Sequence, residues 1–442
     1  MDRRTDALAG AVSASRAGRA LRVAVIGAGW AGLAAAVRAV QQGHQVTIFE
    51  MARQAGGRAR STPGSSLDNG QHILIGAYRD TLDLMRTVGV EPEQALLRCR
   101  LTLRHADGRG LAMPAGPAAP AFAWAVLRAR GWTWGERLQL LAACGRWAAA
   151  GFDCRPDRSV AELCAELPPE VRRLLIDPLC VAALNTPSQE ASAAIFLRVL
   201  RDGLFGGRGA CDLLLPRQPL RELLPEPALR WLQKQGATWR PGVRMMALQP
   251  GAAGWRVDAE AFDAVLLACS AAESARLAHP HAPDWAATAE ALRFEPIITV
   301  YVRNARARLP SPMLVLPDNE RAPAQFVFDH GAIGCQQNRF AFVISDASRW
   351  VEAGLAVTAQ AVLRQAAQTL GPVNWPAGAA RIEHVVAERR ATFRSTPGLL
   401  RPPMHIAPGL FAAGDHVDGP YPATLEGAVQ SGSAAARALR GD

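Results

Sequence analysis

Asp68, Asn69, Gln71 and His72 place a carboxylate, two amides and an imidazole within five positions, with Gly70 between the amides. An apolar run follows directly. Side chains of these types bind polar ligands, and an imidazole or a carboxyl group can also transfer protons near neutral pH. A local turn at the first two residues and a structural histidine would explain the same pattern. The elements that position this stretch decide between the two interpretations.

The first such element is a glycine-rich turn near the start of the chain. Residues 21–26 form a short apolar run typical of a buried strand, GAGWAG follows at 27–32, and residues 33–42 have helical composition. A second predicted strand, 45–49, ends at Glu50, which is expected to accept a hydrogen bond from a ribose hydroxyl. This order of strand, GxGxxG, helix, strand and acidic residue predicts a dinucleotide-binding unit.

Each glycine of the motif has a separate task. Gly27 permits the tight turn, Gly29 lets the backbone approach a pyrophosphate, and Gly32 allows the helix to pack closely on the strand. The phosphates are expected at the helix N-terminus, beside Trp30 and Ala31, because free N–H groups and the helix dipole favour anions there.

A second glycine pair, Gly56 and Gly57, precedes Arg58 shortly after the acidic residue. This pattern suits another close approach to the pyrophosphate, with Arg58 as the counter-charge. With GxGxxG, the acidic residue and GGR in this order, the chain resembles the superfamily of FAD-binding amine oxidases and phytoene desaturases. The resemblance implies FAD as the cofactor.

The C-terminal end carries a matching signature. A short apolar strand at 409–413 leads into a Gly-Asp pair, and a helix rich in small residues begins some ten positions later. The resemblance implies that the aspartate holds the ribityl or pyrophosphate region, and that the positive end of the helix stabilises reduced flavin at its N1/O2 edge. It also implies a backbone contact between Val243 and the adenine. The residues expected to contact the cofactor here are Gly414, Asp415, Thr424, Leu425 and Glu426.

Cofactor signatures at both ends predict a discontinuous α/β architecture. A Rossmann-like FAD-binding domain of the amine oxidase type is expected, interleaved with a substrate domain that is largely helical and has a mixed sheet. The predicted FAD-binding domain comprises residues 21–111, 205–275 and 380–442. The predicted substrate domain comprises residues 112–204 and 276–379.

The middle of the chain is predicted to be mostly helical. Ser159 and Glu162 form a capping box, and Asp177-Pro178 is expected to break a helix. Residues 121–147 carry four tryptophans among arginines. This composition fits a membrane interface and also a solvated helical hairpin, and both interpretations stay open.

Four phrases narrow the resemblance: DNGQHILIGAY at 68–78, PLCVAALNTP at 178–187, LFGGRGACDLLLP at 204–216 and GDHVDGPYPATLEGAVQSG at 414–432. They resemble the hydroxysqualene dehydroxylases of bacterial hopanoid pathways. The resemblance implies an apolar chamber beside the flavin and reductive dehydroxylation of hydroxysqualene, a C30 isoprenoid, to squalene. In this reaction an acid assists departure of the allylic hydroxyl, and a hydride from N5 of reduced flavin quenches the allylic cation.

The resemblance places the opening stretch along the isoalloxazine ring. Gly70 lets the backbone approach the ring, Gln71 and His72 are expected to touch the flavin edge or the substrate, and residues 73–75 are expected to wall the chamber. His72 is the first candidate for the acid. The other catalytic candidates are Gln71, His416, Asp418 and Tyr421.

Three alternatives use the same signatures. A carotenoid-type desaturase would have the same fold and the opposite electron flow. An amine oxidase would typically place a lysine near flavin N5, but the sole lysine, Lys234, falls in a predicted helix of the nucleotide domain. A non-enzymatic lipid-binding flavoprotein would keep FAD for structure alone. No second GxGxxG follows a strand, so no NADPH domain is predicted and the electron donor stays open.

Composition sets the remaining expectations. The 442 residues carry a net charge of +10, without a basic run interleaved with aromatics, so nucleic acid is not an expected partner. Eight scattered cysteines without a CxxC pair predict neither a metal site nor a disulfide framework. No apolar run is long enough to span a bilayer, and residues 1–20 read as a disordered leader. The expected location is cytoplasmic, with peripheral contact at the inner face of the bacterial membrane left open.

Overall fold

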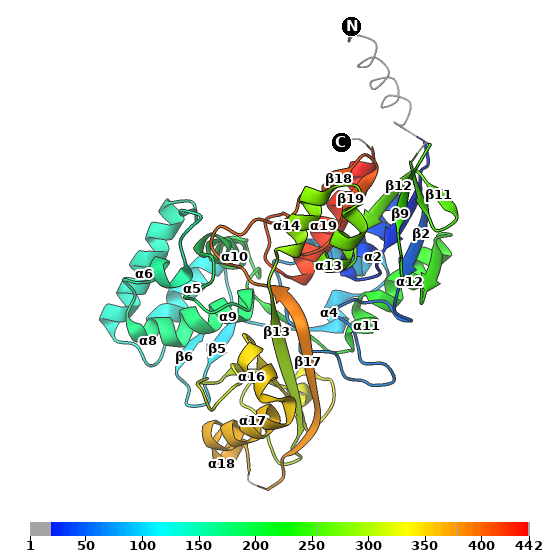
Figure 1. The fold of residues 1–442 in the computed structure, drawn as a ribbon. Helices are drawn as coiled ribbons and strands as arrows, with labels where there is room; N and C mark the ends of the chain where they lie inside the picture. The colour runs from blue at the N-terminus through cyan, green and yellow to red at the C-terminus, as the bar shows by residue number, and fades with distance from the viewer. Residues whose placement is uncertain (1–18, 253, 377, 441–442) are drawn as a thin grey trace.

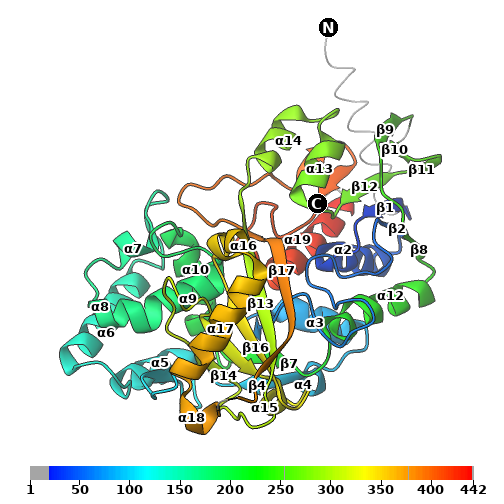
Figure 2. The same ribbon diagram turned by 60° about the horizontal axis from the view of Figure 1, so that its bottom comes forward.

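The computed structural model describes residues 19–252, 254–376 and 378–440. Residues 1–18 of the predicted leader lie outside the described residues. The described chain builds two large sheets and a helical region, which Figures 1 and 2 show from two directions.

The first sheet has six strands in the order β18-β19-β12-β1-β2-β8. All neighbouring strands are parallel except β18, which is an antiparallel edge strand. Blue, green and red elements lie together in Figure 1 because the strands come from distant parts of the chain. They are β1 (Arg22–Ile26), β2 (Gln45–Glu50), β8 (Thr238–Pro241), β12 (Ala264–Leu267), β18 (His405–Ala407) and β19 (Leu410–Ala412).

Both faces of the six-stranded sheet are covered, because its central strands are apolar on both sides. Val23 and Val25 of β1 pack with helices on one face, whereas Ala24 and Ile26 pack on the other face. The first face is covered by α2 (Trp30–Gln41), α3 (Arg79–Thr87), α12 (Pro225–Lys234) and α19 (Leu425–Arg437). The second is covered by β9 (Leu248–Gly251), β10 (Gly254–Val257), β11 (Glu260–Phe262), α13 (Ala271–Ala278) and α14 (Pro283–Glu290).

The second large sheet has five antiparallel strands in the order β14-β15-β16-β13-β17. Its strands are β13 (Phe294–Arg303), β14 (Met313–Val315), β15 (Phe326–Asp329), β16 (Arg339–Ile344) and β17 (Arg381–Phe393). One face packs on α16 (Ser348–Ala353) and α17 (Leu355–Thr369), and α18 (Gly371–Asn374) follows between the buried residues Leu370 and Trp375. The other face, which includes Tyr301, Phe326, Phe328 and Val343, packs with the helical region.

The position of β17 corrects one predicted boundary. The sequence predicts that residues 380–442 belong as a block to the FAD-binding domain, but β17 pairs with β13 along nearly its whole length. Residues 381–393 therefore lie in the five-stranded sheet, because the alternating side chains of β17 find their partners there. Figures 1 and 2 show β13 and β17 side by side, running from the five-stranded sheet toward α13 and α19. The rest of the domain division stays a proposal.

The helical region extends over residues 118–205. It comprises α5 (Ala118–Leu127), α6 (Trp134–Ala149), α7 (Val160–Leu163), α8 (Pro169–Val171), a π-helical turn (Arg172–Ile176), α9 (Asp177–Leu184) and α10 (Ala193–Phe205). The predicted capping box of Ser159 and Glu162 is confirmed. The predicted break at Asp177-Pro178 is wrong: Pro178 lies in the first turn of α9, and the π-helical turn carries the chain into that helix, so the N–H that proline lacks is not needed there.

Small elements connect these layers. A three-stranded sheet has the order β3-β7-β4, and its strands come between β2 and β8 in the sequence. In addition, β5 pairs with β6. These strands are β3 (Leu74–Ile75), β4 (Leu96–Cys99), β5 (Thr102–Arg104), β6 (Gly110–Ala112) and β7 (Leu213–Pro216). The short helices are α4 (Pro92–Ala95), α11 (Leu220–Leu223), α15 (His330–Ile333) and a 3₁₀ turn (Ala438–Arg440).

Candidate functional site

The turn between β1 and α2 needs glycine at two of its positions. Gly27 has a φ of +110°, and a Cβ there would lie 2.5 Å from the carbonyl oxygen of Ala268. A Cβ at Gly32 would lie 2.0 Å from the carbonyl oxygen of Gly27. The turn and the close helix packing therefore occur as the sequence predicts.

The N-terminus of α2 is open to a large cavity. Gly29 is its N-cap, no side chain caps the helix, and its first turn contains no acidic residue. Gly29, Trp30 and Ala31 line the cavity, and the Trp30 indole N–H is held by the carbonyl of Ala59 at 3.0 Å. An uncapped helix N-terminus of this kind has the free N–H groups that bind phosphate.

The second glycine pair lies against the first motif. Gly56 forms a parallel bridge with Gly29, and a Cβ at Gly57 would lie 3.1 Å from the Cα of Gly29. Gly56, Gly57 and Arg58 all line the same cavity. The two glycine motifs thus form one cradle made of backbone atoms. Residues with side chains at these positions would fill the space that the glycines leave open.

Glu50 ends β2 at the edge of this cradle. One carboxylate oxygen accepts a hydrogen bond from the Ala28 N–H and the other from the Ala52 N–H, both at 2.8 Å. Each oxygen keeps a second lone pair, so the predicted ribose contact is compatible with this arrangement. Val243 lies next to it: its N–H donates to the Glu50 carbonyl at 2.9 Å, and the residue lines the cavity.

The two ends of the chain meet at an ion pair between Arg58 and Asp415. The guanidinium also donates to the carbonyl of Ala391 at 2.9 Å, and both charged residues line the cavity. Burial alone would raise the pKa of Asp415, but the charge of Arg58 and the neighbouring His416 hold that pKa well below its ordinary value. Arg58, expected from the sequence to face a pyrophosphate directly, is thus also bound to the aspartate predicted for the ribityl region.

The C-terminal motif closes the cradle from the opposite side. The Gly414 N–H donates to the Ser431 hydroxyl at 3.1 Å. His416 is almost fully buried and lines the cavity, and its Nε2 has no hydrogen-bond partner within the described chain. Thr424 caps α19 by accepting from the Gly427 N–H at 3.0 Å, and Leu425 also lines the cavity. This helix N-terminus therefore lies at the cavity wall, and its contact with the flavin edge stays a prediction.

Glu426 does not line the cavity, contrary to its inclusion among the cofactor contacts. Its carboxylate caps a different helix, α3, by accepting from the N–H groups of Asp80 and Thr81 at 3.0 and 2.9 Å and from the Thr81 hydroxyl at 2.7 Å. The pKa of Glu426 is raised by burial. A buried carboxylate is stabilised best by such donors, which explains why it turns away from the cavity.

The polar stretch that follows the two glycine motifs divides into two parts. Asp68 faces away from the cavity: it accepts from the Ser61 hydroxyl at 2.6 Å and from the Leu220 N–H at 3.0 Å. Asn69, Gly70, Gln71 and His72 line the cavity. Asp68 therefore fixes the segment in place, and its neighbours form the polar part of the cavity wall.

Gln71 is held by a residue that the sequence did not single out. Its side-chain oxygen lies 2.8 Å from Nε2 of His330, and its amide N–H donates to the carbonyl of His72 at 3.1 Å. Burial lowers the pKa of His330 to about 3, so this ring is neutral and can donate one hydrogen bond to Gln71. His330 stands alone in the sequence, without a motif around it, and only the fold reveals the contact.

His72 has a defined tautomer. Its Nδ1 lies 2.9 Å from the carbonyl oxygen of Gly70, which requires Nδ1 to carry the hydrogen, so in the neutral ring Nε2 is an acceptor. Burial lowers the pKa of His72, and the Gly70 carbonyl and the carboxylates of Asp68 and Glu388 offset part of that effect. At neutral pH the ring is therefore uncharged, and it must first bind a proton before it can act as an acid.

A second polar group lies on the cavity wall at α10. The carboxylate of Asp202 lies near Tyr421 and adds to the effect of burial in raising the pKa of its hydroxyl. Arg198 pairs with Asp202 at 2.8 Å, and its guanidinium carbon lies 5.7 Å from the centre of the Tyr421 ring. Burial raises the pKa of Tyr421 and that of the neighbouring Tyr78, so both hydroxyls stay protonated. Asp202 and Tyr78 line the cavity but were not predicted, because their positions on an amphipathic helix and after an apolar run resemble ordinary surface and core sites.

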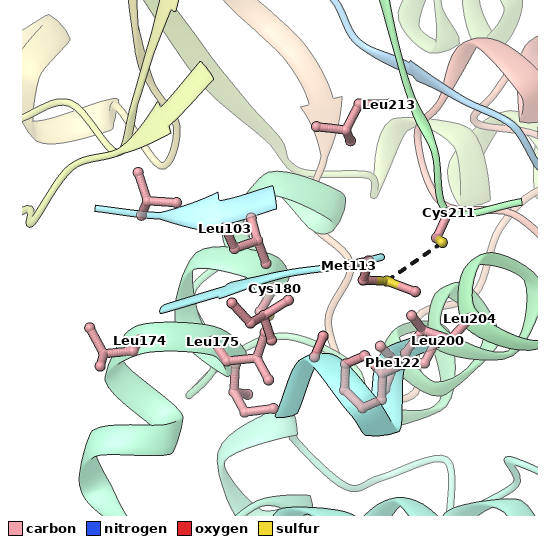
Figure 3. Packing of buried hydrophobic residues seen from close by; sticks show 14 of the residues in the cluster. Leu103, Met113, Phe122, Leu174, Leu175, Cys180, Leu200, Leu204, Cys211 and Leu213 are labelled. Carbon is pink, nitrogen blue, oxygen red and sulfur yellow. Dashed lines mark hydrogen bonds between the residues drawn. The ribbon is translucent and has the colours of Figure 1, made fainter. Parts of the chain in front are cut away.

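Beyond these polar groups the cavity becomes an apolar chamber. The whole cavity measures about 1040 Å³. Ile73 and Ile75 line it as predicted, whereas Leu74 points to the opposite side and packs in the core of the six-stranded sheet. Figure 3 shows part of the wall, where Cys211 meets the sulfur of Met113 at 3.6 Å. Other lining residues are Leu103, Leu179, Val199, Leu200, Leu204, Leu213, Met313, Phe326 and Phe328.

Comparisons with known proteins agree with this geometry. The family model described as flavin containing amine oxidoreductase matches residues 30–440. The hydroxysqualene dehydroxylase of Rhodopseudomonas palustris is 31% identical, over 94% of this chain and 97% of that protein. The zeta-carotene desaturase of Arabidopsis thaliana is 39% identical over 21% of this chain and 17% of its own length. An oxidoreductase of known structure from Methanosarcina mazei has the same fold, with a TM-score of 0.69 at 17% identity, covering 94% of this chain and 99% of its own.

The cradle also fits FAD on its own terms. It combines an uncapped helix N-terminus, a glycine surface without side chains, and a buried His416 nitrogen without a partner in the described chain, all on one cavity. The fold and the site define an FAD-dependent oxidoreductase of the amine oxidase type. The chain belongs to the flavin containing amine oxidoreductase family and, within it, to the hydroxysqualene dehydroxylases.

Two further findings concern the described residues as a whole. They contain no helix that is both long and apolar enough to cross a membrane. Within residues 19–440, apart from the two positions not described, no group of three or more His, Cys, Asp or Glu side chains is placed to hold a metal ion.

Proposed function

We propose that this protein removes the allylic hydroxyl of hydroxysqualene reductively and releases squalene, as a step of squalene and hopanoid biosynthesis. The observation that carries the proposal is the cavity, in which the cofactor cradle continues directly into a chamber with an apolar wall. The near full-length similarity to a hydroxysqualene dehydroxylase supports the same substrate. A C30 hydrocarbon would gain affinity from such a wall at roughly 25 cal/mol per Å² of apolar surface removed from water, before association costs.

The cofactor would be held by both ends of the chain. The α2 N-terminus and the glycine cradle suit the pyrophosphate, Glu50 suits a ribose, and the α19 N-terminus suits the flavin ring. When reduced and bound, FAD supplies the hydride that replaces the departing hydroxyl. Gln71 and His72 are proposed to face the reacting end of the substrate, where the apolar chamber meets the cradle.

The chain's own contribution to the chemistry is a proton and the exclusion of water. The C–O bond breaks as the hydroxyl oxygen takes up a proton and leaves as water, and the carbon then gains a hydride. The apolar wall keeps other water away from the carbon centre while it is electron-deficient. His72 is the first proposed acid, and Tyr421 and His416 are the further candidates, whereas Gln71 is proposed to contact the flavin edge or the substrate. Asp418 is the weakest candidate, because it is largely exposed.

A direct assay tests the reaction. Purified, FAD-loaded protein should convert hydroxysqualene to squalene under anaerobic conditions when the flavin has been reduced chemically, and should not do so with oxidised flavin. Squalene can be measured by gas chromatography, and reoxidation of the flavin by its visible spectrum. A desaturase would show the opposite pattern, with substrate-dependent bleaching of oxidised flavin. Absence of substrate-dependent flavin turnover in either direction would favour a lipid-binding flavoprotein.

No observation favours amine oxidation. The sole lysine, Lys234, is exposed at the end of α12 and does not line the cavity. The lysine that amine oxidases typically place near the flavin has no counterpart on this wall.

The pH dependence of turnover tests the role of His72. Because burial keeps its pKa below 6.5, the protonated fraction is small at pH 7 and grows as the pH falls. The rate should therefore rise on acidification from pH 7.5 toward that lowered pKa, at most about tenfold per pH unit. His72→Gln, assayed in FAD-replete protein, should lose this rise.

Two outcomes would remove His72 from the mechanism. One is a wild-type rate that does not change with pH in single-turnover experiments, where the chemical step is isolated. The other is a His72→Gln variant that keeps both the rate and its rise on acidification. Tyr421→Phe is the comparison variant. The tyrosine hydroxyl stays protonated throughout this pH range, so its loss should leave the rise in rate on acidification in place.

A further inference from the structure

The hairpin of α5 and α6 exposes large apolar side chains. Trp124 is 53% exposed, Trp134 is 65% exposed and Leu138 is 59% exposed. In Figures 1 and 2 this hairpin lies at the opposite end of the molecule from α2. Exposed apolar groups that gather on one element mark interaction surfaces more often than scattered ones do.

α6 is apolar on two sides. Leu140, Ala143 and Trp147 are buried against the rest of the helical region. The outward side of the same helix also carries an apolar stripe, although a helix at a water-exposed surface normally carries polar residues there. The polar residues Gln139 and Arg146 are exposed beside this stripe. The stripe follows a helical spacing of four, four, three and four positions, and its exposed residues are Trp134, Leu138, Ala142, Gly145 and Ala149.

Arginines accompany the exposed tryptophans. Arg137 donates to the carbonyls of Leu127 and Ala129, both at 2.8 Å, and its guanidinium carbon lies 4.7 Å from the centre of the Trp134 ring. Arg128 stands in the same relation to Trp124, at 5.7 Å. The Arg137 contacts tie α5 to α6, so the hairpin presents its tryptophans on a fixed frame.

The charge of the hairpin is one-sided. Between residues 118 and 150 the sequence has four arginines, no lysine and no aspartate, and Glu136 is its one glutamate. That glutamate is occupied in the capping box with Thr133. Arg146 is paired with Glu166, which lies outside the hairpin, at 3.1 Å. Tryptophan and leucine beside the other three arginines match the chemistry of an anionic lipid surface, where the ring and the aliphatic chain enter the interface and the guanidinium meets the headgroups.

We propose that the outward face of the α5–α6 hairpin, defined by Trp124, Trp134 and Leu138, docks the protein on an anionic lipid bilayer. The inner face of the hairpin belongs to the same hydrophobic cluster as Leu200 and Leu204, which line the chamber. Docking would hold the chamber next to the hydrocarbon interior of the bilayer, in which a C30 isoprenoid dissolves. This reason for docking rests on the proposed function, whereas docking itself does not.

Vesicle sedimentation of the FAD-loaded protein tests the proposal. The protein should bind vesicles of phosphatidylglycerol and phosphatidylcholine, bind pure phosphatidylcholine more weakly, and be released as salt is raised. Trp134→Ser/Leu138→Ser should reduce the partition coefficient about tenfold or more, because binding strength scales with the apolar area buried in the interface. The matched control is Val373→Ser/Leu400→Ser, which removes side chains that are 88% and 80% exposed elsewhere and should leave binding unchanged.

Other results would overturn the proposal. One is that the wild-type protein stays in the supernatant. Another is that the hairpin variant binds vesicles as well as wild type does. A third is that the hairpin variant and the control variant lose vesicle binding to the same extent. A dimer that dissociates in the hairpin variant, without binding to vesicles, would assign the face to a second copy of the chain instead.

A turnover assay separates this proposal from the proposed function. With substrate dispersed in detergent, the hairpin variant should match wild type. With substrate embedded in anionic vesicles, it should be slower by the same factor as its loss of binding. If neither protein turns over substrate but the vesicle results hold, the reaction is wrong and the docking surface remains.

Discussion

Asp415→Asn should yield protein that loses most of its FAD and unfolds more easily than wild type. The substitution keeps the shape of the side chain but removes the carboxylate that pairs directly with the guanidinium of Arg58, so that in this mostly buried place the arginine keeps only the weaker interaction with Glu388. Breaking a fully buried pair costs roughly 3–5 kcal/mol. Because the side chain of Arg58 is 34% exposed and that of Asp415 8%, we expect about 2–3 kcal/mol here. Denaturant unfolding and the flavin content of the purified protein measure the two effects.

Two comparisons make this test specific. Glu93→Gln removes the carboxylate of an exposed ion pair with Arg86, and it should change stability by less than about 1 kcal/mol. Arg58→Met in the Asp415→Asn background should cost less than the sum of the single changes, because the uncompensated charge is gone. Wild-type flavin content and stability in Asp415→Asn would contradict the view that this ion pair joins the two halves of the site.

Gly432→Ala should destabilise the protein more than the addition of one methyl group normally does. A Cβ at this position of α19 would lie 2.0 Å from the carbonyl oxygen of Ala31 and 3.1 Å from the N–H nitrogen of Ala35, both in the backbone of α2. Backbone atoms cannot rotate away as side chains do, so α19 must move off α2. We expect a loss of about 3 kcal/mol in the free energy of unfolding, together with weaker FAD binding, because both helices begin at the cofactor cradle.

Gly145→Ala is the matched control. Gly145 also lies inside a helix, α6, but a Cβ there would meet nothing within 4 Å. Alanine is the better helix former, so this change should stabilise the protein by about 0.5–1 kcal/mol. If the two glycine substitutions had the same effect in thermal or denaturant unfolding, close packing of α19 on α2 would not be what Gly432 provides.

The cradle is predictable from the sequence because its requirements are local. The turn and the helix that need glycine at positions 27 and 32 begin within a few residues of each other. The motif can therefore be recognised from the sequence without knowledge of the fold. The resemblance to the family, rather than local geometry, implies that Asp415 contacts the same cofactor. The sequence could not show that Asp415 binds Arg58, since the two residues are 357 positions apart.

The wrong and the missing predictions have one physical cause, which is contact between residues far apart in the sequence. Glu426 was assigned to the cofactor from its place in a motif, but its carboxylate finds better donors on α3, 345 positions away. His330 and Asp202 lack motifs, and their roles arise from contacts with Gln71 and Tyr421 that only the tertiary structure creates. The boundary at residue 380 failed similarly, because the partner of β17 is β13, which lies about 80 residues earlier.

The separation of Arg58 and Asp415 also has a consequence during synthesis. A ribosome adds about 5–20 residues per second, so the second residue of the pair is made roughly 20–70 s after the first. Through nearly all of this interval the nascent chain contains Arg58 and the glycine cradle, but it still lacks β19 and α19, which complete the site. FAD can therefore be captured firmly only after Asp415 has been made, and until then chaperones would meet a chain whose apolar chamber is not yet closed.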